Sequence, residues 1–200
     1  MSDVFKCSKS EIESEIPSAH AKLNVSLLVT IRNTTLIPPF AGYENYTLAA
    51  HQNGSWTLRA DYYPGYLRGF ETFSQLFKLN DQDEYYVEGL PITIDDFPQH
   101  EWRGVMIDTS RHFLKVETIK KTIDACLYNK ANVLHWHITD EDSFPLEIAS
   151  RPEISQYGSF PGKTYSKANV ADIIQYALRK GVRVVPEIDT PGHSYSWGRS

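Results

Sequence analysis

The chain has 200 residues, of which 41% are hydrophobic and 22% charged, and this composition supports a buried core and excludes a disordered chain. Its formal net charge is -5 without a long run of one sign, which argues against a nucleic-acid-binding surface. No stretch is apolar enough to span a membrane, and residues 1–10 are too polar for the apolar segment of a signal peptide. We therefore expect small or neutral partners, and one large domain or two small ones.

Two residue types bear on the cellular compartment. Asn-x-Ser/Thr triplets begin at Asn24, Asn33, Asn45 and Asn53. They indicate a secretory route, although such triplets also arise by chance in a segment rich in Asn and Thr. The only cysteines are Cys7 and Cys126, which excludes a disulfide framework and a cysteine-based metal motif. Cys126 falls within a helical pattern and is predicted to lie in the core.

The first half of the chain predicts strands around one helix. Strand-like runs cover residues 23–31, 46–48 and 56–58, with Asn53-Gly54 as a hairpin turn between the last two, and they predict an antiparallel sheet. Residues 67–79 place apolar side chains at near-helical spacing, and residues 85–87 and 92–94 are further strand candidates. Residues 1–98 therefore predict a small α+β domain without a constellation of reactive side chains.

After Pro98, short apolar runs alternate with helical patterns. Strands are predicted at 105–107, 133–138 and 182–188, with helices at about 116–129 and from Asn169, the expected N-cap, to Lys180-Gly181. This βαβαβ order predicts a parallel sheet with right-handed crossovers, in either a doubly wound sheet or a barrel. Three strands alone cannot close a barrel.

All three predicted parallel strands end in polar residues, at 108–112 (DTSRH), 135–140 (HWHITD) and 187–193 (EIDTPGH). One such end is explained by a helix cap or an ion pair, but three in succession favour a site, because reactive residues gather at the carboxyl ends of parallel strands. His135 and His137 share one strand face and could bind a metal, as in an amidohydrolase-like barrel. Neutral core histidines would satisfy the same pattern.

Several of these segments also resemble a known family. Residues 103–112 (RGVMIDTSRH), 135–140 and 189–198 (DTPGHSYSWG) are similar to the β-N-acetylhexosaminidases of glycoside hydrolase family 20, as are residues 128–133, 143–147 and, in the front domain, 67–76. The resemblance runs from about residue 44 to 198 in matching order and spacing. It implies an α+β N-terminal domain over residues 1–98, followed over residues 99–200 by the first three β/α units of a truncated (β/α)8 TIM barrel.

The implied reaction is the exo-acting hydrolysis of terminal non-reducing β-linked N-acetylglucosamine or N-acetylgalactosamine with retention of configuration. In this family the substrate's own 2-acetamido oxygen attacks the anomeric carbon. A Glu protonates the leaving oxygen, and the Asp before it orients the acetamido group. That pair belongs after the fourth barrel strand, so the resemblance implies a fragment with no catalytic residue of its own. Asp140-Glu141 follows the second strand and is not assigned the acid role.

The resemblance assigns binding roles to residues at the strand ends. Arg111 matches the family's Arg that reaches the hydroxyls of the terminal sugar, Asp140 an acidic residue near that pocket, and His193 a His that lines it. Glu187 and Asp189 are expected to support the Arg or His from behind. Neither a metal nor a cofactor is implied.

The implied partners are terminal N-acetylhexosamines of glycoproteins, glycolipids or chitooligosaccharides. A lysosomal or secreted location, an acidic optimum and a homodimer of the complete enzyme are also implied. Two alternatives stay open: a non-catalytic truncated product that binds sugar, and the metal-dependent amidohydrolase-like barrel. Trp136 is predicted to be a core residue rather than a sugar-stacking platform.

Overall fold

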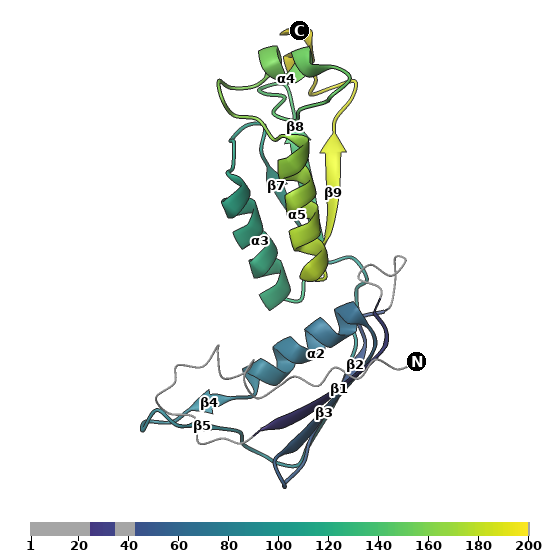
Figure 1. Ribbon diagram of the computed structural model, residues 1–200, viewed down its shortest axis with the longest axis vertical. Helices are drawn as coiled ribbons and strands as arrows, with labels where there is room; N and C mark the ends of the chain where they lie inside the picture. The colour runs from purple at the N-terminus through teal and green to yellow at the C-terminus, as the bar shows by residue number, and fades with distance from the viewer. Residues whose placement is uncertain (1–24, 35–42, 200) are drawn as a thin grey trace. The chain divides into compact units, whose positions relative to one another are not determined.

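The computed structural model describes residues 25–34 and 43–199 and separates the chain into two compact units, Met1–Glu101 and Trp102–Ser200 (Figure 1). Among the described residues, no helix is long and apolar enough to cross a membrane.

Within its described residues, the first unit contains one helix and two small sheets. Its elements are β1 (Ser26–Asn33), β2 (Tyr46–Ala50), β3 (Ser55–Tyr62), α2 (Tyr63–Gln75), β4 (Lys78–Leu79), β5 (Tyr85–Tyr86) and β6 (Ile92–Asp96). The larger sheet has the order β1-β3-β2-β6, and β4 pairs with β5. Helix α2 lies along the larger sheet (Figure 1). The hairpin predicted at Asn53-Gly54 is confirmed by the antiparallel pairing of β2 with β3, with Gly54 at φ 80°.

The prediction of an entirely antiparallel sheet is wrong at β1, which runs parallel to β3. This register sets Leu27 beside Trp56 and Val29 beside Leu58, and all four side chains are buried. The parallel arrangement therefore unites the apolar faces of both strands in one core. The helix also differs from the predicted range 67–79: it begins four residues earlier, with Pro64 in its first turn, and ends before β4.

The second unit is a three-stranded parallel sheet of order β7-β8-β9, as predicted. Its elements are β7 (Gly104–Asp108), α3 (Val116–Tyr128), β8 (Val133–Thr139), α4 (Pro152–Gly158), α5 (Lys167–Arg179), β9 (Arg183–Ile188) and the 3-10 helix η1 (Tyr195–Arg199). Helices α3 and α5 lie side by side over the sheet (Figure 1). Helix α4 was not predicted, because its seven residues include only Ile154 and Tyr157 as large apolar side chains.

The start of α5 corrects one prediction. Ser166, not Asn169, is the N-cap: its hydroxyl accepts from the Asn169 N–H at 3.2 Å, while the Asn169 Oδ1 accepts from the Ser166 N–H at 3.0 Å. Asn169 is thus the second partner of a capping box, three residues inside the helix. The helix ends as predicted at Lys180, followed by Gly181 at φ 65°.

Side chains along β8 point alternately into the core and toward the polar cluster at the strand ends. Leu134, Trp136 and Ile138 pack with α3 and α5 in the core of this unit. Trp136 is fully buried, and its Nε1 donates to the Thr109 Oγ1 at 2.9 Å, so its predicted core position is confirmed. Because successive side chains of a strand point to opposite faces, His135 and His137 lie on the other face of the sheet. Cys126 is 2% exposed and belongs to the same core, as predicted.

Candidate active site

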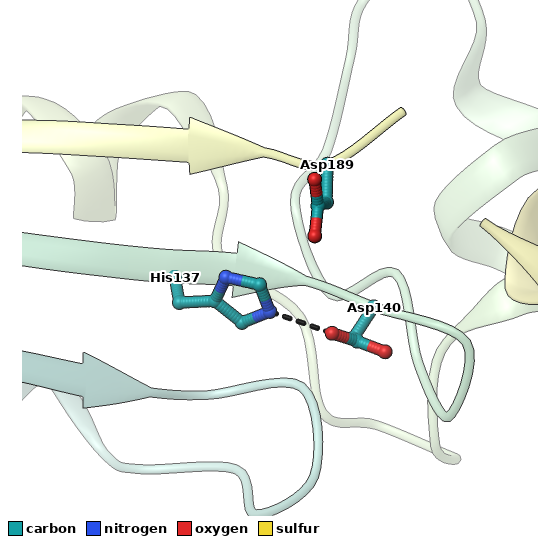
Figure 2. Close-up of side chains that lie close together, drawn as sticks. All are labelled: His137, Asp140 and Asp189. Carbon is teal, nitrogen blue, oxygen red and sulfur yellow. Dashed lines mark hydrogen bonds and ion pairs between the residues drawn. The ribbon is translucent and has the colours of Figure 1, made fainter. Parts of the chain in front are cut away.

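Parallel pairing brings the polar ends of the three strands together. Asp108 ends β7 and pairs in register with His137, which in turn pairs with Glu187 on β9. Figure 2 shows the His137 ring pointing toward Asp140, with Asp189 beside them after β9. Polar atoms of these last three side chains all lie within 4.8 Å of one another. The three strand ends therefore form one cluster.

Three carboxylates hold the Arg111 guanidinium. Its Nη1 lies 2.7 Å from the Asp108 Oδ2, its Nη2 2.8 Å from the Asp140 Oδ2, and its Nε 3.4 Å from the Asp142 Oδ2. Asp108 is itself fixed, because its Oδ1 accepts the N–H groups of Ser110 and Arg111 at 2.9 and 3.1 Å. The Arg111 side chain nevertheless remains 44% exposed. The Arg111 guanidinium is therefore held in place while part of it remains accessible to solvent.

Asp140 lies at the centre of the cluster, and its side chain is completely buried. Its Oδ1 accepts the Glu141 N–H at 2.6 Å and lies 3.0 Å from the His193 Nδ1. Its Oδ2 lies 2.7 Å from the His137 Nε2 and also pairs with Arg111. Burial acts to raise the pKa of this carboxyl, but the hydrogen bonds from Glu141, His137 and His193 and the Arg111 charge outweigh it and lower the pKa.

His137 links Asp140 to Glu187. Its Nδ1 lies 3.0 Å from the Glu187 Oε2, which also bonds the His135 Nε2. Burial acts to lower the pKa of His137, but the hydrogen bonds to Glu187 and Asp140 raise it above its ordinary value. The same bond to His137 lowers the pKa of Glu187, against burial and with help from His135. Two carboxylates therefore face the two ring nitrogens of His137 and favour its protonated form.

This protonation state bears on the metal-dependent alternative. An imidazolium has no lone pair to offer a metal, and both ring nitrogens of His137 already face carboxylate oxygens. The group formed by His137, Asp140 and Asp189 therefore lacks a free imidazole nitrogen. The arrangement favours an ion-paired cluster over a metal centre of the amidohydrolase type.

His193 reaches the cluster from the loop after β9. It adopts a left-handed backbone with φ 57°, and its side chain is 52% exposed. Its Nδ1 lies 3.2 Å from the Arg111 Nη2, in addition to its contact with Asp140. Arg111 and His193 are thus neighbours that both face solvent.

The structure places the residues expected at the site in three positions. Arg111, Asp140 and His193 contact one another directly. Glu187 lies behind them and bonds the two histidines of β8 instead of Arg111. Within the described residues, Asp189 lies beside His137 and Asp140 without making a hydrogen bond or ion pair.

Sequence reasoning missed three members of the cluster. His137 was considered as a metal ligand or as a neutral core histidine, and neither Asp108 nor Asp142 was given a role. The signal for both residues was their position near the carboxyl ends of their strands: Asp108 is the last residue of β7, and His137 lies two residues before the end of β8, on the face opposite the core. Nothing in the local sequence distinguishes Asp142, whose contact with Arg111 depends on the loop that follows β8.

Comparison with known proteins identifies the family. The family model described as glycosyl hydrolase family 20, catalytic domain, matches residues 100–200, about half of the chain. The chain belongs to glycosyl hydrolase family 20. A second model, described as beta-acetyl hexosaminidase like, matches residues 4–76. The family is one whose fold contains a TIM barrel, so the parallel sheet of residues 102–200 belongs to an α/β architecture of that class.

Individual relatives agree with this membership. The chain is 40% identical over 200 residues to the beta-hexosaminidase subunit beta of Felis catus, covering 98% of this chain and 37% of the relative. The solved structure of a Flavobacterium johnsoniae chitobiase aligns with a TM-score of 0.75 and 34% identity, over 86% of this chain and 26% of that one. A mutant Streptomyces plicatus beta-hexosaminidase with its product GlcNAc aligns with a TM-score of 0.67 and 33% identity, over 82% and 34%. The chain spans about a third of the length of the curated relatives it matches.

Proposed function

We propose that the protein is an exo-acting β-N-acetylhexosaminidase that hydrolyses terminal β-linked N-acetylglucosamine or N-acetylgalactosamine with retention. In this proposal, residues 1–98 form the N-terminal hexosaminidase-like domain and residues 99–200 supply the first three β/α units of a (β/α)8 catalytic barrel. The family membership and the names of the relatives support the reaction. The three parallel strands in sequential order support the barrel assignment.

One observation carries the proposal: Arg111 is fixed by three carboxylates yet keeps 44% of its side chain exposed. A guanidinium offers five donors in a rigid fork, which suits the neighbouring hydroxyls of a sugar ring. His193 adds a second exposed polar group beside it. We assign both residues to binding the terminal sugar.

Asp140 contributes in another way. Its two oxygens already face four donors and its side chain is fully buried, so a sugar hydroxyl could bind it only by displacing one of them. Asp140 therefore serves the sugar site by holding Arg111 and His193 in place. Glu187 supports it through His137, and Asp189 lies next to both.

Asp140 is also unsuited to act as the general acid. A general acid needs a pKa near the working pH, whereas the pKa of Asp140 is lowered and its carboxylate stays ionised. In this family the substrate's acetamido group replaces an enzyme nucleophile. The residues described here accordingly bind and orient the sugar, and none of them is assigned the proton transfer.

Calorimetric titration of the chain with N-acetylglucosamine and N-acetylgalactosamine tests this site. Arg111→Lys keeps the charge but removes the fork, and we expect it to weaken binding roughly 10- to 100-fold, from the loss of charged hydrogen bonds. The matched control is Arg151→Lys, because Arg151 is 72% exposed and pairs only at 3.6 Å with Glu153; its affinity should equal that of wild type. A folded wild-type chain that binds neither sugar, or an Arg111→Lys variant of unchanged affinity, contradicts the assignment. Hydrolysis of an aryl β-N-acetylglucosaminide by the native protein tests the reaction.

A lysosomal or secreted location is part of the same proposal. Asn33, Asn45 and Asn53 are exposed, so each can carry a glycan, while Asn24 lies outside the described residues. A shift in gel mobility of the natively expressed protein after endoglycosidase treatment is the expected result, and unchanged mobility contradicts the secretory route. The homodimer stays a prediction, to be tested by sedimentation of the native protein.

A further inference from the structure

Both ring nitrogens of His137 face carboxylate oxygens, and only one protonation state satisfies both contacts. The Nε2 lies 2.7 Å from the Asp140 Oδ2 and the Nδ1 lies 3.0 Å from the Glu187 Oε2. A neutral imidazole has one N–H and one lone pair, so it would turn a lone pair toward one of the two carboxylates. An imidazolium donates to both.

We infer that His137 is a positioning residue of the sugar site: it stays doubly protonated between two carboxylates and fixes Asp140 in place. This inference rests on the proposed function, because the site that it positions is the sugar site. The His137 side chain is only 10% exposed, and its bond to Asp140 lets it act on the sugar site through that carboxylate.

The charges around His137 agree with this state. The groups that face it are Asp108 and Arg111 at the end of β7 and in the loop after it, His135 and Asp140 on and after β8, and Glu187, Asp189 and His193 on and after β9. The nearest cation is Arg111, whose Nη1 lies 3.4 Å from the His137 Nε2. The carboxylates of Asp140 and Glu187 lie closer, at 2.7 and 3.0 Å, so attraction prevails.

The positioning effect follows from the donors to Asp140. The Asp140 Oδ2 is shared between His137 and Arg111, and its side chain has no exposed surface through which water could replace a lost donor. Without His137, this buried charge would depend on Arg111 for the donor to Oδ2. The guanidinium would then be drawn toward Asp140 and away from the sugar, which weakens binding without removing any group that touches the sugar.

Histidine-selective ¹⁵N NMR of the chain tests the protonation state without any need for activity. His137→Gln identifies the resonances of His137 among the seven histidines. We expect both ring nitrogens of His137 to remain protonated at about pH 7, above the ordinary pKa of about 6.5, and Glu187→Gln to move the titration to lower pH. A His137 ring that is neutral at about pH 6, or a titration that Glu187→Gln leaves unchanged, overturns the inference. Because Glu187→Gln keeps the His137 ring, its titration can still be compared with that of wild type when His137→Gln does not fold.

Sugar titration tests the positioning role. We expect His137→Gln to weaken N-acetylglucosamine binding about tenfold, because the buried Asp140 Oδ2 loses a charged donor. His51→Gln is the matched control, since His51 is exposed in the turn between β2 and β3, and its affinity should equal that of wild type. Equal affinity of His137→Gln and wild type overturns the role.

The two failures can be told apart. If wild type binds no sugar while His137 stays doubly protonated, the proposed function fails and so does the positioning role that rests on it, whereas the ion pairing stands. If wild type binds sugar but His137 is neutral, the proposed function stands and the inference about His137 fails.

Discussion

Two arginines, one in each unit, both pair with carboxylates but differ in how much of the side chain is exposed. Arg68 on α2 has a side chain only 2% exposed, and its Nε lies 2.7 Å from the Oε2 of Glu44. Arg111 after β7 also pairs with carboxylates, but 44% of its side chain is exposed. Pairing alone therefore does not distinguish a structural arginine from a binding one. The exposed fraction separates these two arginines, because Arg111, unlike Arg68, keeps donors where a ligand can reach them, and this agrees with the sugar-binding role that we propose for Arg111.

We expect the largest effect from breaking the buried ion pair between Arg68 and Glu44 in the first unit. Arg68→Met leaves the Glu44 carboxylate buried without this partner, and we expect the free energy of unfolding to fall by about 3–5 kcal/mol. Urea denaturation followed by circular dichroism measures this loss. The double variant Glu44→Gln/Arg68→Met should recover most of it, and the sugar affinity of any folded fraction should stay unchanged. An Arg68→Met variant as stable as wild type would show that the pair is not structural.

The second effect concerns the buried carboxylate of the second unit. The Asp140 carboxylate accepts from four donors, and Asp140→Asn replaces it with a neutral amide. We expect a loss of about 1.5–3 kcal/mol in the free energy of unfolding, together with weaker sugar binding. Asp142→Asn is the control, because Asp142 is 49% exposed and lies 3.4 Å from the Arg111 Nε. Its cost should stay below about 1 kcal/mol. Equal effects of the two variants, measured by melting and sugar titration, would contradict the central place of Asp140.

These two units also differ in how far sequence could predict them. The βαβαβ pattern of the second unit was predictable, because buried parallel strands and amphipathic helices leave strong apolar periodicities. In the first unit the direction of β1 could not be predicted, because the alternating apolar residues Leu27, Val29 and Ile31 suit a parallel and an antiparallel neighbour equally. Partner choice depends on packing between distant segments.

The same reasoning applies to the site. Arg111, Asp140 and His193 were expected from residues at strand ends and from the family resemblance, and their contacts in the structure leave their sugar-binding roles as proposals. The link through His137 was not predictable, because it depends on the register that sets His137 beside Glu187. Side-chain pairing across a sheet is visible only once that register is known.

A smaller effect sharpens the comparison between the helices of the second unit. Ser166 caps α5 through its hydroxyl, whereas Lys115 at the start of α3 makes no side-chain cap hydrogen bond. We expect Ser166→Ala to cost about 1 kcal/mol of stability and Lys115→Ala to change it by a few tenths of a kcal/mol at most. Thermal melting of both variants measures the difference. If the two substitutions cost the same, the capping box does not stabilise α5.

The smallest effect is a pH dependence confined to the site. The pKa values of Asp140 and Glu187 are lowered from 3.8 and 4.5, so their contribution to stability is full above those values and is lost as the pH falls through the lower folded values. The pKa of His137 is raised from 6.5, so its contribution is full below that value and is lost as the pH rises through the higher folded value.

All three contributions are therefore complete between pH 4.5 and 6.5. We expect the difference in melting temperature between wild type and His137→Gln to be largest in this window and to shrink on both sides. His51→Gln should differ from wild type by the same small amount at every pH. A wild-type advantage over His137→Gln that grows steadily above pH 6.5 contradicts the assignment of His137 as a cation.

The central claim is that Arg111, held by its carboxylates, binds the terminal sugar through its exposed face. A crystal structure of the chain with N-acetylglucosamine tests it most directly. The account predicts sugar hydroxyls within hydrogen-bond distance of the Arg111 guanidinium, with the contacts of Arg111 to Asp108 and Asp140 preserved. A sugar bound elsewhere, or Arg111 turned away from the bound sugar, would contradict the account.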